Sequence, residues 1–479
     1  MKTKKIFATA VSLSLLLLMH IGAAQSIGAE TGPDIMARID KGVEWLQTHR
    51  IVTTLGSYYS SGTGEGVTVD VAENSAVAYM FTMHTKLVPM RRNVPEILAI
   101  LNFTLNAKTG AFFHPYFTMS GGWVSKPQPY YRSAEILQNL AFSSFHLRLE
   151  DQILTEDDKE LLDEVVESSE DLIGELAKTY RTGDGAWRLK YEDGTLQARL
   201  KENSEILVSL LHVAAYEEEW GSPERSSLYG GYAQETARWI LETQEKEPSR
   251  WGYGGFSQAR GTNSQPMISN AAAVFSLTTY LRLISLLDED PDPTIQEVRE
   301  AIILWEEAFL KGMVDEHGGP YQERDEAGAR EYPKELLAAS LTLRAMAETW
   351  VVHGDPKYRI WCISLYNWIT GKNEAENDLQ LEDGSYLEGF TAPGTSGSAA
   401  GLYVNAYTTA SLVYGAWINI PEVPPRTAQS LATLTLLLFA SGFRLVNRVC
   451  PGRARTGRRS SRPQPMNPGS PYESCIGNP

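Results

Sequence analysis

The feature that most constrains this chain is a six-fold alternation between two kinds of helix-like segment. One kind is apolar on nearly every side, and it recurs over residues 76–83, 136–145, 206–215, 271–287, 336–346 and 406–418. The other kind is amphipathic and highly charged, with apolar residues at every third or fourth position, and it recurs over residues 157–180, 234–245 and 294–311. A helix that is apolar all round must be enclosed by protein. The pattern therefore predicts fully buried helices alternating with half-exposed ones.

Loops rich in glycine and aromatic residues separate the two members of each pair. They lie near Gly56, Ala111, Gly183, Trp251, His317 and Asp383. Their spacing of about 55 to 72 residues suits a two-helix unit with a long loop. No region alternates apolar and polar residues over a sustained length, so β-structure is expected only as short hairpins in these loops.

The simplest fold for such a pattern is an all-α (α/α)6 toroid of six helical hairpins, spanning residues 34–420 as one domain. We expect the ring to close, because the end repeats of an open array would expose their apolar faces. An open helical superhelix is the alternative. In a closed ring all six loops lie at one mouth, where the inner helices direct their positive N-terminal ends, so a binding site is expected there.

Charge is distributed unevenly along the 479 residues, whose net charge is −16. The first thirty residues carry three lysines and one glutamate, residues 426–479 carry eight arginines and one glutamate, and residues 31–425 therefore carry −25. An acidic body of this size repels nucleic acid, so no nucleic-acid partner is expected. Only one of three cysteines, Cys362, lies in the body, which excludes a disulfide framework and a cysteine-rich zinc site there. We expect no metal and no other cofactor.

Both ends of the chain carry targeting patterns. Residues 1–30 combine basic residues, an apolar run and small residues, which is typical of a secretory signal peptide, with an uncleaved anchor as the alternative. Residues 427–443 are uncharged and are followed by arginines, which predicts a transmembrane or sorting helix with its basic side in the cytoplasm. Residues 444–479 are rich in Arg, Pro, Ser and Gly and are expected to be disordered.

The order of Pro421-Glu-Val-Pro424, apolar helix and arginine cluster resembles the PEP-type C-terminal sorting signals of bacteria and their archaeal counterparts. Such signals usually end soon after the first arginines, whereas this chain continues to Pro479. Retention as a plain membrane anchor remains the alternative. Either reading implies an exported protein, extracellular or at the cell surface, with the membrane as a partner.

Acidic residues recur near the starts of the predicted inner helices. Glu73, Glu135, Glu205 and Glu335 are expected to occupy matching places, with Asn270 in repeat four and Asn405 or Tyr407 in repeat six. One interpretation is a ring of carboxylates suited to acid–base work or to binding sugar hydroxyls. The other is structural, because an acid in the first turn stabilises the helix dipole and Asp70-x-x-Glu73 has the form of a capping box.

The loops also hold acidic and aromatic side chains that do not repeat. Aromatic rings stack on sugar faces and carboxylates accept hydrogen bonds from hydroxyls, so this mixture suits a carbohydrate partner. Aromatic residues such as Trp187, Trp251 and Tyr386 could equally fill the mouth of the ring.

With the Gly183-Asp-Gly-Ala-Trp187 and Glu382-Asp-Gly-Ser-Tyr386 loops in view, residues 34–420 resemble the α/α-toroid proteins. One branch contains the six-hairpin glycosidases and related polysaccharide lyases. The other contains squalene cyclases and protein prenyltransferases, but the chain has no Asp-x-Asp-Asp cluster, and Cys362 falls on a predicted outer helix. The resemblance to the glycan branch implies an exported polysaccharide hydrolase or lyase with its site at the mouth.

Two sets of residues are candidates for that chemistry. For hydrolysis, Asp184, Asp383 and Glu388 would act as acid–base groups and Glu205 and Glu335 would orient the substrate. For elimination, which needs a base and a charge neutraliser, the set is His114, Tyr116, Arg132, His317 and Tyr321. Further substrate contacts are expected from Trp123, Trp187, Trp251, Tyr253 and Tyr386. The alternatives are a non-catalytic surface protein that binds a glycan or a protein, and a terpenoid-cyclase-like toroid.

Overall fold

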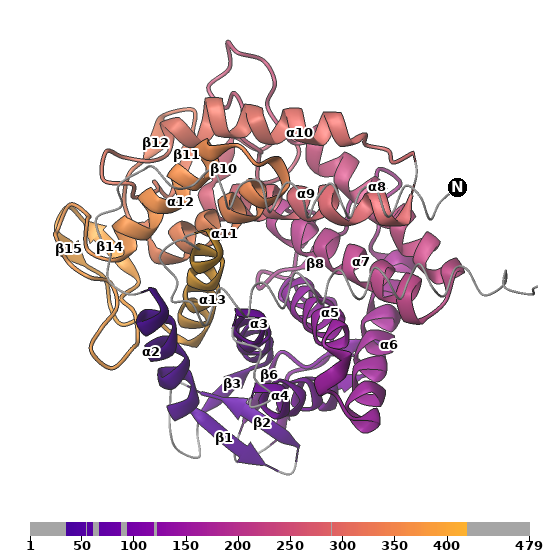
Figure 1. Cartoon of the computed structure of the whole chain (residues 1–479). Coiled ribbons are helices and arrows are strands. Elements are labelled where there is room, and N and C mark those ends of the chain that lie inside the picture. The colour runs from indigo at the N-terminus through magenta and orange to yellow at the C-terminus, as the bar shows by residue number, and fades with distance from the viewer. Residues whose placement is uncertain are drawn as a thin grey trace, which may run out of the picture.

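The computed structural model describes residues 35–53, 55–60, 67–87, 93–118, 122–288 and 290–418. The predicted signal peptide, the helix at 427–443 and the tail at 444–479 lie outside the described residues. Within the described part, twelve α-helices alternate between an inner and an outer ring (Figure 1).

The inner ring consists of the helices that follow the six loops. They are α3 (Val71–Leu87), α5 (Ser133–Leu149), α7 (Leu200–Trp220), α9 (Met267–Leu287), α11 (Leu336–His353) and α13 (Leu402–Ile418). Each packs against the next, and α13 packs against α3, so the ring is closed (Figure 1). All six apolar segments predicted from the sequence lie inside these helices. The predicted (α/α)6 toroid is therefore confirmed, and an open superhelix is excluded.

The outer ring covers the inner one with amphipathic helices. They are α2 (Ile35–Thr48), α4 (Val94–Asn106), α6 (Glu156–Thr179), α8 (Pro223–Glu242), α10 (Ile295–Leu304) and α12 (Pro356–Ile369). A capping box begins α6: the Thr155 hydroxyl accepts a hydrogen bond from the Asp158 N–H at 3.2 Å, and the Asp158 carboxylate accepts one from the Thr155 N–H at 2.7 Å. α10 continues into a π-helical turn, η3 (Trp305–Phe309), and a 3-10 turn, η4 (Leu310–Gly312).

Among the described residues, the strands of the loops are short and pair antiparallel, and half of the sheets are hairpins of the predicted kind. Three pairs form hairpins within one loop: β1 (Arg50–Thr53) with β2 (Gly56–Tyr59), β4 (Lys108–Thr109) with β5 (Phe112–Phe113), and β8 (Leu189–Lys190) with β9 (Leu196–Gln197). Three small sheets instead join the loops of neighbouring repeats. They are β3 (Thr68–Asp70) with β6 (Tyr116–Thr118) and β7 (Gly122–Val124), β10 (Ser264–Pro266) with β11 (Glu323–Asp325) and β12 (Gly328–Arg330), and β13 (Lys334–Glu335) with β14 (Gly389–Ala392) and β15 (Thr395–Ser396).

One helix of the described chain, α9, is long and apolar enough to cross a membrane by length and composition. It belongs to the inner ring, however, and 78% of its most apolar window is buried inside the molecule. Enclosure by neighbouring helices accounts for its composition, as it does for the other inner helices.

An asparagine clamp recurs where the loops meet the inner helices. The fourth residue of α3, α7, α9 and α13 is an asparagine whose side-chain oxygen accepts a hydrogen bond from the backbone N–H of a loop aromatic residue. The pairs are Asn74 with Tyr59 (2.6 Å), Asn203 with Trp187 (2.8 Å), Asn270 with Phe256 (2.8 Å) and Asn405 with Tyr386 (2.9 Å). The recurring aromatic loop residue therefore has a structural role in these four repeats.

Glycines in the same loops allow close contact with the next outer helix. Gly384 has a φ of +92°, and a Cβ added there would lie 2.3 Å from the carbonyl oxygen of Lys41 on α2. Gly185 has a φ of +87°, and its added Cβ would lie 2.5 Å from the carbonyl oxygen of Glu235 on α8. Only glycine fits both the backbone conformation and the approach. These turns attach each repeat to its neighbour.

Candidate active site

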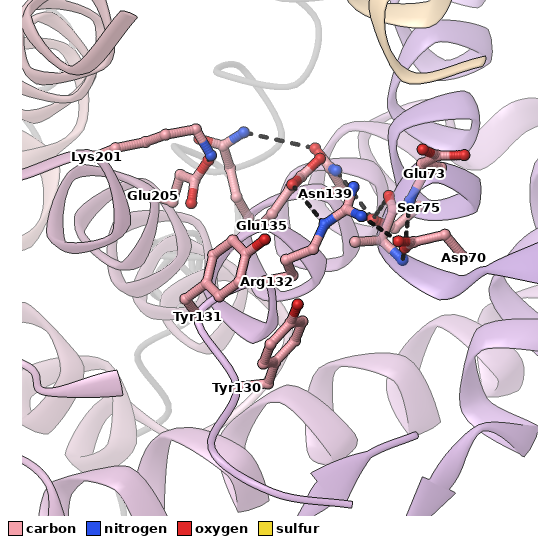
Figure 2. A network of polar contacts seen from close by, with 12 residues as sticks. Asp70, Glu73, Ser75, Tyr130, Tyr131, Arg132, Glu135, Asn139, Lys201 and Glu205 are labelled. Atoms are coloured by element: carbon pink, nitrogen blue, oxygen red, sulfur yellow. Dashed lines mark hydrogen bonds and ion pairs between the residues drawn. The ribbon is translucent and has the colours of Figure 1, made fainter. Parts of the chain in front are cut away.

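Charged side chains from the starts of three inner helices converge inside the ring at its loop end (Figure 2). We call this group the mouth cluster, and its members are Asp70, Glu73, Arg132, Glu135, Lys201 and Glu205. They come from the beginnings of α3, α5 and α7. The ring centre of Tyr403 lies 5.7 Å from the Arg132 guanidinium carbon, so α13, which packs beside α3 but is far from it in the sequence, also contacts the cluster.

Arg132 joins two acids of the cluster. Its guanidinium pairs with the carboxylate of Asp70, and its Nε lies 3.9 Å from Oε2 of Glu135. Asp70 also accepts hydrogen bonds from the backbone N–H groups of Ala72 at 2.8 Å and Glu73 at 3.2 Å. Asp70 therefore caps α3, as the sequence predicted, and holds Arg132 in place at the same time.

Lys201 holds the carboxylate of Glu205. These residues are four apart on α7, and Lys201 Nζ lies 2.6 Å from Glu205 Oε1. Burial alone would lower the pKa of Lys201, but the carboxylates of Glu205, Glu135 and Glu202 raise it above its ordinary value. Burial raises the pKa of Glu205, and the charge of Lys201 opposes that shift. A charged lysine at this distance stabilises Glu205 as a carboxylate.

Glu135 has no cation as close to it as Lys201 is to Glu205. Its burial raises its pKa to about 8, although Lys201 and Arg132 act to lower it. Glu73, half-buried nearby, has its pKa raised to about 7 by burial and by the charge of Asp70. Burial thus raises the pKa of both glutamates, and the close charge of Lys201 favours the carboxylate form of Glu205. Two neighbouring carboxyl groups with such different cation contacts are candidates for an acid and a base.

Each of these two glutamates has an oxygen that is not used in holding the fold. Oε1 of Glu135 and Oε2 of Glu205 are buried and have no hydrogen-bond partner in the protein. An unpaired buried oxygen is unfavourable unless a ligand, a proton or water satisfies it. The free oxygens are thus available for chemistry, while Lys201 and Arg132 orient the two side chains.

The mouth cluster is open on the side of its cations. The side chains of Lys201 and Arg132 are 22% and 19% exposed, whereas that of Glu135 is 3% exposed beneath them. A cavity of about 10 Å³ between Asp70, Tyr130 and Arg132 has room for about one water molecule. A ligand would approach past Lys201 and Arg132 to reach Glu135.

Polar groups continue below the mouth cluster. Arg344 of α11 is only 2% exposed, its guanidinium carbon lies 3.9 Å from the ring centre of Phe275, and it donates a hydrogen bond to Tyr79 Oη at 3.3 Å. Tyr407 of α13 donates to Asn139 of α5 at 3.1 Å. The interior of the ring is therefore polar along part of its depth. Within the described residues, no group of three or more His, Cys, Asp or Glu side chains is arranged to hold a metal ion.

The predicted alignment of four glutamates is wrong. Glu73 and Glu135 are each the third residue of their helices, but Glu205 is the sixth residue of α7 and Glu335 precedes α11. The position that does recur is the clamping asparagine, to which Asn270 and Asn405 belong. Glu205 still reaches the mouth cluster because it lies one helical turn deeper on the inward face.

Asp184 and Asp383, predicted as acid–base groups, lie in loop turns outside the mouth cluster. Asp184 accepts a hydrogen bond from the Thr182 hydroxyl and pairs with Arg260 at 2.7 Å. Asp383 accepts hydrogen bonds from the N–H and hydroxyl of Ser385 at 3.0 and 2.6 Å, which lower its pKa. Both carboxylates stabilise the turns whose glycines contact the next outer helix.

Glu335 and Glu388 form a separate acidic pair in repeats five and six. Glu335 accepts a hydrogen bond from Gln322 at 3.2 Å. Burial and the charge of Glu388 raise the pKa of Glu335. Glu388 is exposed and accepts a hydrogen bond from the Ser398 hydroxyl at 2.7 Å. The structure brings these two predicted residues together, but not with Glu205.

Trp187 and Tyr386, predicted as substrate contacts, are core residues. Both are completely buried; Trp187 donates its indole N–H to Thr236 at 2.9 Å, and Tyr386 Oη accepts a hydrogen bond from Gln380 at 3.0 Å. Neither ring presents a face to a ligand, which corrects that expectation. Both side chains instead fill space in the core of the toroid beside its mouth, which is the other interpretation that the sequence allows.

The elimination set is dispersed among different loops. His114 bonds through Nδ1 to the Ser125 carbonyl at 2.7 Å and stacks on Trp123, which packs against Phe103 and Phe117. Tyr116 lies on β6 opposite Asp70 in register. Two members lie in repeat five. His317 is exposed beside Glu316, and the ring centre of Tyr321 lies 5.8 Å from Lys334 Nζ. Of the five, only Arg132 belongs to the mouth cluster.

Trp251 and Tyr253 lie in the loop of repeat four and are half-buried. Trp251 lines a groove of about 570 Å³ that shares no residue with the mouth cluster. Tyr253 donates its backbone N–H to the Arg250 carbonyl at 3.1 Å and belongs to the turn beside that groove.

Lys201 and Tyr403 belong to the site but were not singled out from the sequence. A signal for Lys201 is present, since it is four residues before Glu205 at the start of a helix whose middle, residues 206–215, is mostly apolar. A charged pair in such a helix must face a polar interior or a partner. Tyr403 carries no comparable signal, because its place opposite Arg132 depends on how the ring closes.

Comparison with known proteins identifies the fold. No protein-family model matches the chain, and no curated protein matches it by sequence. Among solved structures, cellobiose 2-epimerase from Spirochaeta thermophila DSM 6192 is 14% identical with a TM-score of 0.61, over 81% of this chain and 96% of that one. A sugar epimerase from a ruminal bacterium is 11% identical with a TM-score of 0.61, over 79% and 97%.

A third similar structure is the GH76 alpha-mannanase from Bacteroides thetaiotaomicron, 12% identical with a TM-score of 0.52 over 80% of this chain and 96% of that one. These likenesses span nearly all of the described body. They show that the chain has an (α/α)6 toroid fold, as the resemblance in its loops predicted.

Proposed function

We propose that this chain is a glycan-active enzyme that hydrolyses glycosidic bonds by acid–base catalysis in the mouth cluster. The observation that carries the proposal is the pair of buried glutamates, Glu135 and Glu205, each of which has one oxygen without a hydrogen-bond partner in the protein. Burial raises the pKa of Glu135 to about 8, and Lys201 Nζ contacts Glu205 at 2.6 Å and favours its carboxylate form. The names of the similar structures, which are sugar epimerases and a mannanase, support a carbohydrate as the substrate class.

In this mechanism Glu135 is the general acid. It donates its proton to the glycosidic oxygen as the bond from that oxygen to the anomeric carbon breaks. A water molecule adds to the anomeric carbon, and its proton passes to the carboxylate of Glu205. Exchange with solvent then restores the proton of Glu135 and the charge of Glu205. Lys201 and Arg132 hold the two side chains in place, and the closer contact of Lys201 favours the ionised form of Glu205.

Hydrolysis fits this arrangement better than elimination. Elimination beside a uronate needs a free cation to neutralise the substrate carboxylate. Arg132 already pairs with Asp70 and lies beside Glu135, and the histidines of the elimination set lie on loops of repeats two and five. The mouth cluster contains carboxyl groups suited to acid and base, which is what glycoside hydrolysis requires.

The test is a screen of the purified protein against a panel of polysaccharides, with new reducing ends and unsaturated products measured in parallel. The account expects reducing ends from the unaltered protein and almost none from Glu135→Gln. Glu160→Gln, which changes an exposed glutamate on α6, is the matched control and should behave like the unaltered protein. Unsaturated products, or equal activity in Glu135→Gln, would contradict the proposal.

A non-catalytic glycan-binding protein is the second candidate. It is favoured by the small size of the cavity beside the mouth cluster, about 10 Å³. The same screen separates the two functions when retention of the protein on each insoluble polysaccharide is also measured. Retention without any product supports the binding function.

Export and surface retention are part of the proposal. Their support lies in residues 1–30, which have the pattern of a signal peptide, and residues 427–443, which have that of an anchor or sorting helix. N-terminal sequencing of the mature protein and fractionation of cells expressing the full chain test both. An intact N-terminus in the cytosolic fraction would contradict export.

A further inference from the structure

The loop of repeat four, between α8 and α9, forms a groove of about 570 Å³ together with the β11–β12 turn. This volume lies within the range of ligand-binding pockets in proteins, which is roughly 300 to 1,000 Å³. The mouth cluster comes from the starts of α3, α5 and α7, and none of its residues lines the groove. The two sites are therefore separate.

Two buried amide oxygens in the groove have no partner in the protein. Gln244 and Gln265 line it and are 6% and 0% exposed, and Oε1 of each has no hydrogen bond. Their amide nitrogens fix their orientation: Gln244 donates to the carbonyls of Gly254 and Ala301 at 3.0 and 2.8 Å, and Gln265 donates to that of Gly252 at 2.8 Å. The oxygens are acceptors that await a donor such as a hydroxyl group.

The two arginines that line the groove are already paired with carboxylates. Arg250 lies 3.1 Å from Glu245 and 3.2 Å from Glu247, and Arg260 pairs with Asp184 and Glu242. An anionic ligand would find no free guanidinium here and would meet the carboxylate of Glu326, which accepts a hydrogen bond from Asn263 at 2.5 Å. A cationic ligand would compete with the arginines for the other carboxylates. The groove therefore fits a neutral ligand with many hydroxyl groups.

Trp251 supplies the apolar surface that such a ligand needs. It lines the groove and is half-buried, so part of its ring system is accessible. Pyranose rings present an apolar face that stacks on an aromatic ring, while their hydroxyls hydrogen-bond to groups at its edge. A tryptophan beside two unsatisfied amide oxygens provides both kinds of contact.

We propose that this groove binds a neutral oligosaccharide, with Trp251 stacking on a sugar ring and Gln244 and Gln265 accepting hydrogen bonds from its hydroxyls. It is a second glycan site, in addition to the proposed reacting centre in the mouth cluster. A polysaccharide-active protein uses such a site to hold a chain while another part of it reacts. Binding in the groove does not require that the mouth cluster be catalytic.

The test measures the stoichiometry of binding by isothermal titration calorimetry with a panel of neutral oligosaccharides that includes cellohexaose and mannohexaose, and with an oligogalacturonate. The full chain carrying Glu135→Gln is used so that no ligand is consumed. We expect a neutral oligosaccharide to bind in the groove, and that binding event to be lost in Glu135→Gln/Trp251→Ala. The oligogalacturonate is expected not to bind in the groove.

Trp361→Ala in the same background is the matched control, because Trp361 is also a half-buried tryptophan but lies on α12, where its indole donates to Glu306. It should leave the stoichiometry unchanged. The proposal is overturned if no neutral oligosaccharide on the panel binds, or if Trp251→Ala and Trp361→Ala give the same stoichiometry. If an oligosaccharide binds in the groove but the unaltered protein releases no product, the proposed hydrolytic function is wrong and the proposed binding site is still supported.

Discussion

At the scale of single residues, a buried carboxyl group keeps its proton unless a cation offsets the loss of hydration. Glu135 and Glu205 lie in the same cluster but differ in this respect, because Lys201 contacts Glu205 at 2.6 Å while Arg132 reaches Glu135 only at 3.9 Å. This difference in distance between cation and carboxylate is the reason for proposing Glu135 as the acid and Glu205 as the base.

The first prediction concerns the general acid. Glu135→Gln keeps the shape of the side chain but cannot donate a proton, so kcat/KM should fall by roughly 10² to 10⁴-fold. In the unaltered protein kcat/KM should decline as pH rises through about 8, because the proton of Glu135 is lost there. The rate of reducing-end release across the pH range measures both effects. A profile that stays flat through pH 8 in the unaltered protein contradicts the assignment.

The second prediction concerns the lysine. Lys201 lowers the pKa of both Glu205 and Glu135, so Lys201→Met should raise both and move both limbs of the pH–rate profile upward. At neutral pH less Glu205 is ionised, and kcat/KM should be lower. Lys201→Arg retains the charge and should largely preserve the profile. If Lys201→Met lowered the rate equally at every pH, the lysine would have only a structural role.

At the scale of elements, the apolar inner helices could be predicted because burial on all sides leaves an unmistakable composition. The outer helices are predicted less completely. The predicted segment at 234–245 covers only the second half of α8 (Pro223–Glu242), because the first turns of this helix are polar and contain glycine. The site was only partly predictable. Arg132 and Glu205 could be named, but which loop groups meet inside the ring depends on helix register, which composition does not encode.

The loop motif Asp-Gly-x-aromatic shows why the predicted catalytic aspartates do not lie in the mouth cluster. The sequence predicts Asp383 and Asp184 as acid–base groups because they are acidic, recur in the loops and lie next to aromatic residues. Their positions follow instead from the turn: the aspartate accepts hydrogen bonds within it, the glycine contacts an outer helix, and the aromatic residue enters the core. Recurrence in a repeat protein marks shared structure, whereas the mouth cluster occurs once.

The third prediction tests the glycine contact. Gly384→Ala places a methyl group 2.3 Å from the Lys41 carbonyl oxygen at a φ of +92°, so it should lower the free energy of unfolding by more than about 1 kcal/mol. Gly394→Ala is the matched control, since Gly394 also has a positive φ, +67°, but its added Cβ meets nothing within 4 Å. Urea unfolding compares the two. Equal losses would mean that the contact with α2 contributes nothing beyond backbone strain.

At the scale of the whole molecule, ring closure joins the sixth repeat to the first. Arg38 of α2 makes two hydrogen bonds to Asp378, at 2.8 and 2.5 Å, and Gln380 donates to the Arg38 carbonyl at 2.9 Å. α13 packs against both α2 and α3. The seam between the ends of the domain is thus built from polar contacts outside and helix packing inside.

The fourth prediction concerns this seam. Asp378→Ala removes the carboxylate that accepts two hydrogen bonds from Arg38, whose side chain is only 12% exposed. The change should lower the free energy of unfolding by about 1–3 kcal/mol. Hydrogen exchange should quicken in α2 but not in α7, on the far side of the ring. Asp171→Ala is the control, because Asp171 is 62% exposed in its pair with Lys108 and should change stability by less than about 1 kcal/mol. Unchanged exchange in α2 would contradict the role of this pair in closure.

The account depends most on a neutral carboxyl group inside the ring at physiological pH, and infrared spectroscopy observes that group directly. The difference spectrum between the unaltered protein and Glu135→Gln should contain the C=O band of a protonated carboxyl group at pH 7. That band should vanish as pH rises through about 8. If the difference spectrum shows only carboxylate bands at pH 7, Glu135 is ionised and cannot be the acid, and the proposed chemistry of the mouth cluster is wrong.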